Sequence, residues 1–206
     1  MIIKVCGMRD ADNIHAVDGL EGVTWMGFIF HPSSPRFVSE VPACLPKHCK
    51  RVGVFVNESL QGILTRHEAF RFNLIQLHGN EPPDFCQALR ANIGEEVSLI
   101  KVLPITVPSD LKAALPYQGL ADYFLFETKC KGYGGSGKQF DWEVLQGYTG
   151  NTPFLIAGGI TPADTEKVLS FRHPRFTGID LNSGFESAPG LKDTAALRDF
   201  IHKIHH

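Results

Sequence analysis

The chain has 206 residues, of which 43% are hydrophobic, enough for one sizeable core but too few for two ordinary domains. Its formal net charge of −2 excludes a strongly basic surface of the kind that binds nucleic acid or anionic membranes. No apolar run is as long as a membrane span, so we expect one domain over residues 1–206 and a small-molecule partner, with no nucleic acid and no membrane.

Eight short apolar runs, each bounded by turn residues, predict β-strands along the chain. They lie at residues 2–5, 24–30, 51–56, 73–77, 98–103, 123–126, 154–157 and 176–181. The first run leads directly into a turn at Gly7, so we expect no cleavable signal peptide. The repeat of about 25 residues suits a strand, a helix and two short loops.

Helical patterns lie between these strands, with apolar residues three or four positions apart. They lie around residues 14–20, 63–70, 85–89 and 197–204. Asp10 or Asp12 is a suitable cap for the first helix, and Thr161, followed by proline, predicts a further helix start. The pattern is weak at residues 41–48, where two prolines interrupt any helix, and at residues 110–115.

The alternation of eight strands with helices predicts an α/β fold, a closed (β/α)₈ barrel of the TIM type. The main alternative is an open doubly wound sheet, which usually has fewer strands at this length. Five cysteines make an odd count that does not suit a secreted disulfide framework, so a reducing cytosol fits better. Cys44, His48 and Cys49 match no familiar zinc spacing, and we expect no metal site there.

Polar side chains follow the strands at the end where barrel enzymes place their active sites. Alternation along the strands puts Cys6, His78, Glu127 and Asp180 in the inward-facing layer at this end. A single cysteine or histidine there would have an ordinary explanation as a core residue. Four polar groups on one rim are hard to explain by packing and predict a functional site.

Two glycine-containing turns follow the last two strands. Gly158 and Gly159 lead into the helix that starts at Thr161, and Ser183 and Gly184 follow the eighth strand. In barrels these two loops often bind phosphate through backbone N–H groups, and glycine lets the ligand approach the backbone closely. The alternative is that both are only tight turns, but their joint presence favours a phosphate site.

Six motifs together carry a resemblance to the phosphoribosylanthranilate isomerase family over nearly the whole chain. They are Lys-Val-Cys-Gly-Met at 4–8, Ser-Pro-Arg-Phe at 34–37, Gln-Leu-His-Gly at 76–79, Gly-Gly-Ser-Gly-Lys at 134–138 with Phe-Asp-Trp at 140–142, Ala-Gly-Gly-Ile at 157–160, and Asp-Leu-Asn-Ser-Gly-Phe-Glu at 180–186. The resemblance implies a (β/α)₈ barrel that converts N-(5-phosphoribosyl)anthranilate to the 1-deoxyribulose 5-phosphate product. The implied reaction is an Amadori rearrangement in tryptophan biosynthesis that uses neither cofactor nor metal.

The resemblance also implies roles for particular residues. Cys6 matches the general base that removes the proton from ribose C2, and Glu127 occupies the position of the general acid that protonates the ring oxygen. Arg36 matches the arginine that holds the anthranilate carboxylate, a task suited to a planar guanidinium. Asp180 matches an aspartate near the sugar, and His78 is assigned with it to substrate binding. The implied partner is a phosphosugar, bound by a monomer or homodimer.

The sequence departs from the family pattern at two positions. The acid is usually Asp and is here Glu127, for which we expect the backbone or the loop at 128–133 to be set back in compensation. Asn182 stands where the family commonly has a serine, a milder change if the phosphate contacts there are made by the backbone. The alternatives are another phosphosugar isomerase, such as the histidine-pathway enzyme with its paired aspartates, or a barrel that binds a phosphorylated ligand without catalysis.

Overall fold

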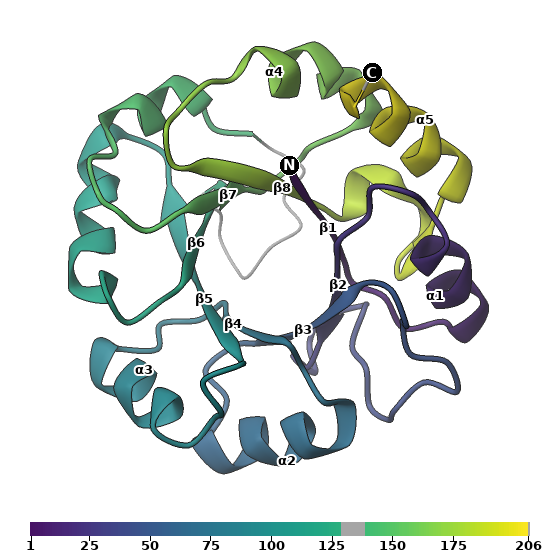
Figure 1. Ribbon diagram of the computed structural model, residues 1–206, viewed down its shortest axis with the longest axis horizontal. Coiled ribbons are helices and arrows are strands. Elements are labelled where there is room, and N and C mark those ends of the chain that lie inside the picture. Colours follow the sequence, from purple (N-terminus) through teal and green to yellow (C-terminus); the bar gives the residue numbers. More distant parts are fainter. Residues whose placement is uncertain (129–138, 206) are drawn as a thin grey trace.

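Eight parallel strands form a closed barrel in sequence order, and the eighth pairs with the first (Figure 1). The computed structural model describes residues 1–128 and 139–205. The strands are β1 (Ile2–Cys6), β2 (Trp25–Ile29), β3 (Lys50–Phe55), β4 (Leu74–Leu77), β5 (Ser98–Ile105), β6 (Tyr123–Thr128), β7 (Phe154–Ile156) and β8 (Phe176–Leu181). The predicted barrel is thus confirmed, with strand ends moved by a residue or two.

Helices surround the barrel on its outside (Figure 1). The α-helices are α1 (Ala11–Asp18), α2 (Leu60–Phe70), α3 (Pro83–Arg90), α4 (Thr165–Ser170) and α5 (Thr194–His205). Of the two candidate caps for α1, Asp10 is the one that accepts a hydrogen bond from the N–H of Asn13, at 2.8 Å. The predicted start at Thr161 is also confirmed, since a 3₁₀ turn, η3 (Pro162–Asp164), begins there and continues as α4.

Among the described residues, three of the connections show no α-helix where strict alternation would give one. Residues 30–49, between β2 and β3, form no helix, as expected from Pro42 and Pro46. The next two are 3₁₀ helices, η1 (Pro108–Tyr117) before β6 and η2 (Trp142–Gly147) before β7. After β8 the chain forms the turn η4 (Ser183–Phe185) and the hairpin of β9 (Glu186–Ala188) and β10 (Leu191–Lys192) before α5.

Apolar side chains fill both faces of the barrel wall, so the strands are covered on two sides. On β6 Phe124 and Phe126 pack outward beneath the helices, while Leu125 points into the barrel. The inner cluster also contains Trp25, Val52, Val54, Leu74, Ile100, Val102, Leu155 and Ala157. The barrel interior is therefore packed, and polar groups gather at the end where the strands finish. No helix in the described part of the chain has the length and apolar character needed to cross a membrane.

Candidate active site

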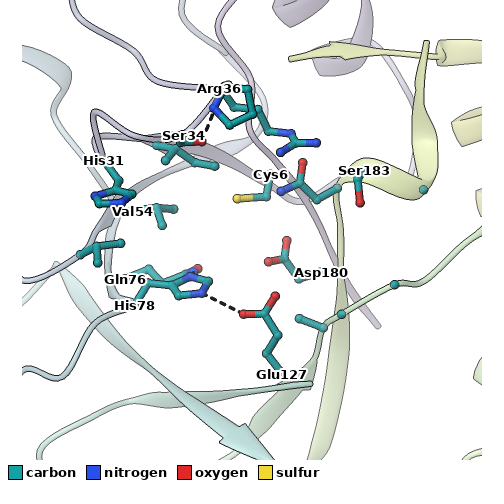
Figure 2. A pocket seen from close by; sticks show the side chains of 18 of the residues that line it. Cys6, His31, Ser34, Arg36, Val54, Gln76, His78, Glu127, Asp180 and Ser183 are labelled. Carbon is teal, nitrogen blue, oxygen red and sulfur yellow. Dashed lines mark hydrogen bonds and ion pairs between the residues drawn. The ribbon is translucent and has the colours of Figure 1, made fainter. Parts of the chain in front are cut away.

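A cavity of about 460 Å³ opens at the carboxyl ends of the strands. Its lining contains all nine residues that the sequence singled out: Cys6, Arg36, His78, Glu127, Gly158, Gly159, Asp180, Ser183 and Gly184. Figure 2 shows the Cys6 sulfur and the Glu127 carboxylate directed into the same space, with Asp180 between them in this view. Residues that lie up to 178 positions apart in the sequence thus meet at one pocket because the barrel closes.

Cys6 lies on the pocket floor above a buried ion pair. Lys4, two residues earlier on the same face of β1, is fully buried, and its Nζ donates to Asp180 Oδ2 at 2.8 Å. Burial alone would lower the pKa of Lys4, but the neighbouring Asp180 carboxylate raises it above its ordinary value, so the ammonium stays charged. Burial raises the pKa of the Cys6 thiol, although Lys4 acts in the opposite direction.

Glu127 ends the inward face of β6, opposite the histidine that directly follows β4. Its Oε2 lies 2.8 Å from Nε2 of His78, and Nδ1 of His78 is 3.1 Å from Nε2 of Gln76 (Figure 2). With the Gln76 amide oriented in this way, it donates to Nδ1, and the ring proton sits on Nε2 facing Glu127. Burial would raise the pKa of Glu127, but His78 outweighs it and holds that pKa below its ordinary value.

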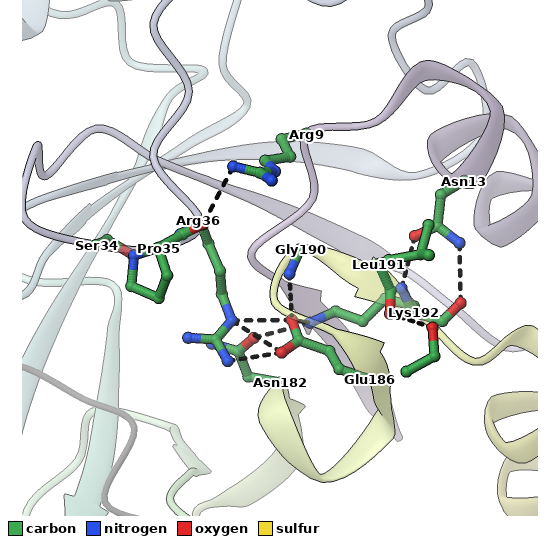
Figure 3. A network of polar contacts seen from close by, with 11 residues as sticks. Arg9, Asn13, Ser34, Pro35, Arg36, Asn182, Glu186, Gly190, Leu191 and Lys192 are labelled. Carbon is green, nitrogen blue, oxygen red and sulfur yellow. Dashed lines mark hydrogen bonds and ion pairs between the residues drawn. The ribbon is translucent and has the colours of Figure 1, made fainter.

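Arg36 reaches the pocket rim from the loop after β2, and a carboxylate fixes its orientation (Figure 3). Its Nε donates to Glu186 Oε1 at 2.8 Å and its Nη2 to Glu186 Oε2 at 2.6 Å. Lys192 donates to the same carboxylate at 2.5 Å and to Asn182 Oδ1 at 2.8 Å. Burial would raise the pKa of Glu186, but these two cations lower it, so Glu186 stays ionised between them and holds Arg36 in place.

The two glycine-containing loops touch each other at one side of the pocket. Gly158 and Gly159 both have positive φ, 94° and 66°, a conformation that favours glycine. A side chain on Gly184 would lie 2.1 Å from the carbonyl oxygen of Ile160, so the loop after β8 packs directly on the loop after β7. Gln139 donates to the Gly159 carbonyl at 2.8 Å and helps to fix that loop.

Some of the sequence predictions fall on residues outside the described ranges. The Gly-Gly-Ser-Gly-Lys motif at 134–138 lies there, as does nearly all of the loop at 128–133 that we expect to compensate for Glu127. In the part of the chain that the structure describes, no group of three His, Cys, Asp or Glu side chains is arranged to hold a metal ion.

Sequence reasoning assigned no role to four residues that shape the site: Lys4, Gln76, Glu186 and Lys192. Lys4 carried a signal, because a lysine in the middle of an apolar strand shares the face of Cys6. Gln76 likewise shares the face of His78. Nothing local indicated that Glu186 and Lys192 would meet Arg36, since 150 positions separate Arg36 from Glu186.

The family model and the named relatives identify one family. The family described as N-(5'phosphoribosyl)anthranilate (PRA) isomerase matches residues 3–203. A relative from Phocaeicola vulgatus named N-(5'-phosphoribosyl)anthranilate isomerase is 52% identical over 204 residues, which cover 99% of this chain and 98% of the relative.

Solved structures lead to the same family. The chain resembles the crystal structure of phosphoribosyl anthranilate isomerase from Thermus thermophilus with a TM-score of 0.82 and 28% identity, covering 100% of this chain and 98% of that one. It also resembles, with a TM-score of 0.78 and 26% identity, an isomerase solved in complex with reduced 1-(o-carboxyphenylamino)-1-deoxyribulose 5-phosphate, covering 100% and 99%.

Proposed function

The chain belongs to the family of N-(5'-phosphoribosyl)anthranilate isomerases, and from this we propose that its pocket works with Cys6 as general base and Glu127 as general acid. The enzyme converts N-(5-phosphoribosyl)anthranilate to 1-(2-carboxyphenylamino)-1-deoxyribulose 5-phosphate in tryptophan biosynthesis. The observation that carries the assignment is that a thiol and a carboxyl group face one cavity between Arg36 and the glycine loops. We propose that it acts in the cytosol as a monomer or homodimer.

The rearrangement needs one proton donor and one proton acceptor. Glu127 donates a proton to the ring oxygen of the ribose, the C1–O bond breaks, and the anilino nitrogen supplies the electron pair that forms the C1=N iminium. The Cys6 thiolate then removes the proton from C2, the electrons of that C–H bond form the C1=C2 bond of an enaminol, and the π electrons of C1=N return to the nitrogen. Tautomerisation of the enaminol gives the ketone, so the reaction is balanced without a redox carrier.

The reaction needs Cys6 as a thiolate and Glu127 as a carboxylic acid, but the unliganded site favours the opposite protonation state of each. Burial favours the thiol of Cys6, and His78 favours the carboxylate of Glu127. The reactive pair, a thiolate with a carboxylic acid, has the same total number of protons. Productive binding therefore requires one proton to move from Cys6 to Glu127, which makes charges near the sulfur important.

The substrate has an anion at each end, and the pocket offers a site for each. Arg36 is proposed to hold the anthranilate carboxylate. Among the described residues, Nη1 of Arg36 donates to no acceptor. The bonds from Nε and Nη2 to Glu186 fix the orientation of the guanidinium plane. The loops around Gly159 and Ser183 are proposed to bind the phosphate through backbone N–H groups. Binding at both ends would fix the reacting carbons between Cys6 and Glu127.

Replacing Arg36 by Ala is expected mainly to weaken substrate binding. Loss of a charge-assisted hydrogen bond typically costs about 1.5–3 kcal/mol, which corresponds to a rise in KM of roughly 10- to 100-fold. Arg9→Ala is a matched control, because Arg9 donates to the Pro35 carbonyl nearby at 3.1 Å but does not line the pocket. Steady-state kinetics measure both variants, and an unchanged KM in Arg36→Ala would rule out the assigned role.

The activity itself is tested by following the loss of anthranilate fluorescence when the purified chain is given N-(5-phosphoribosyl)anthranilate. We expect turnover, and we expect inorganic phosphate to raise KM without changing kcat, because it competes at the glycine loops. Absence of competition would contradict the proposed phosphate site. Substrate binding without turnover would instead indicate a barrel that keeps its ligand but has lost catalysis.

A further inference from the structure

Lys4 is a buried cation that the reaction scheme does not use. It is 0% exposed and lies inside the barrel, where the surrounding side chains are mainly apolar. Its ammonium has one carboxylate partner, Asp180, which stands opposite it in the register of β1 and β8. A buried ion pair returns little or no net stability compared with an apolar pair of similar volume. The stability of the fold therefore does not explain why a charged residue occupies this position.

The side chain of Lys4 runs toward Cys6. Both residues point inward from β1, and Cys6 stands beside Gly27 of β2 in the register. A Cβ on Gly27 would lie 2.8 Å from Cys6 Sγ and 3.3 Å from Lys4 Cε. The glycine thus leaves a space that the sulfur and the end of the lysine chain share. Lys4 does not line the cavity, whereas Cys6 and Asp180 do, so Lys4 acts from beneath the floor.

We propose that Lys4 is a positioning residue whose ammonium stabilises the thiolate of Cys6 from beneath the pocket floor. The inference rests on the proposed role of Cys6 as general base. Because the reaction requires negative charge on the sulfur, a fixed cation beneath it supplies in a dry site what water would supply in solution. Asp180 keeps that cation protonated and in place.

Other charged groups also surround the sulfur. Arg36 from the loop after β2 is on the pocket rim, Lys192 from β10 is buried behind it, and both are engaged by Glu186. Asp180 from β8 opposes thiolate formation. Among the groups that lower the pKa of Cys6, Lys4 has the largest effect, after burial has raised it. Removing Lys4 should therefore change the thiol more than removing any other single cation.

Lys4 also acts on Glu127, where it opposes the protonation of the carboxylate that the reaction needs. Lys4 also lowers the pKa of Glu127, although burial and His78 affect that carboxyl group more. As the proton moves from Cys6 to Glu127, the negative charge moves from β6 toward β1. Lys4 lies on β1 beside Cys6 and therefore favours this transfer.

The test measures the rate at which iodoacetamide alkylates Cys6 as a function of pH, with peptide mapping to separate it from the other cysteines. In Lys4→Met we expect alkylation at pH 8 to be slower than in the parent by about tenfold or more, because the thiolate loses its cation. We expect kcat to fall while KM changes little. A purely structural role predicts the opposite sign, since a loosened floor would expose Cys6 and speed up alkylation.

Lys101→Met is the matched control. Lys101 is also buried and bonded to a carboxylate, Glu81, at 2.8 Å, but it lies on the outward face of β5. This variant loses a comparable buried pair and should leave the alkylation profile of Cys6 unchanged. An equal slowing in Lys101→Met would attribute the effect to general destabilisation and overturn the proposal.

The double variant Lys4→Met/Asp180→Asn covers the case in which Lys4→Met alone does not fold, because it leaves no unpaired buried charge. Its alkylation should also be slower than that of the parent, since the loss of Lys4 outweighs the loss of the opposing Asp180. Alkylation at or above the parent rate in a folded variant would overturn the proposal. If alkylated Cys6 still supported turnover, the general-base role would fail, whereas the effect of Lys4 on alkylation would stand.

Discussion

Replacing Cys6 by Ser is expected to lower kcat/KM by about a thousandfold while the barrel remains folded. A hydroxyl is a far poorer base than a thiolate near neutral pH, so the C2 proton would have no competent acceptor. The exchange changes one atom of a side chain that is 4% exposed and leaves the neighbouring pair of Lys4 and Asp180 intact. Steady-state kinetics and thermal unfolding of the variant would show the two effects separately.

Cys49→Ser is the matched control for this exchange. Cys49 is also buried, and its Sγ donates to the Val23 carbonyl at 3.4 Å, a bond that a serine hydroxyl can replace. Burial and the nearby Asp18 raise the pKa of Cys49 to about 12, and Cys49 does not line the pocket as Cys6 does, so it should resist alkylation under conditions that modify Cys6. Activity should be retained in Cys49→Ser. Full turnover by a protein with Cys6 completely alkylated would end the assignment of Cys6 as base.

The strand positions and their inward faces were readable from the sequence because each strand is short, apolar and bounded by turns. Period-two alternation in the sequence puts Leu125 on one face of its strand and Phe124 and Phe126 on the other, which is the arrangement in the structure. The same period brought Cys6, His78, Glu127 and Asp180 to one rim once the sheet was taken as closed. These features depend on local pattern, which a single sequence contains.

The contacts that orient the site were not readable, because they join segments far apart in the chain. The bonds from Arg36 to Glu186, and from Lys4 to Asp180 across 176 positions, arise only when the barrel closes. The kind of helix in the connections was also missed, since η1 and η2 are 3₁₀ helices. Pro116 inside η1 has no N–H to donate to an α-helical hydrogen bond, and tertiary packing decides the rest.

Glu127, the proposed general acid, is one C–C bond longer than the aspartate usual in the family, and its replacement by Gln is expected to lower kcat by about a thousandfold. Gln has the same length, and its amide oxygen can still accept the hydrogen bond that Nε2 of His78 makes to Glu127 at 2.8 Å. The geometry is thereby kept, and the proton that opens the ribose ring is lost. Steady-state kinetics with a thermal-unfolding control measure this, and a fully active Glu127→Gln enzyme would place the acid elsewhere.

Glu127→Asp makes the complementary change, because it keeps an ionisable proton but shortens the arm by one C–C bond, about 1.5 Å. The shorter carboxyl group would lose contact with His78, which at present holds it in the pocket. A displacement of about 1 Å can cost roughly a hundredfold in rate, so we expect Glu127→Asp to be slower than the parent even though relatives usually carry Asp there. A Glu127→Asp enzyme much faster than the parent would show instead that the longer side chain is a handicap that the surrounding structure does not compensate.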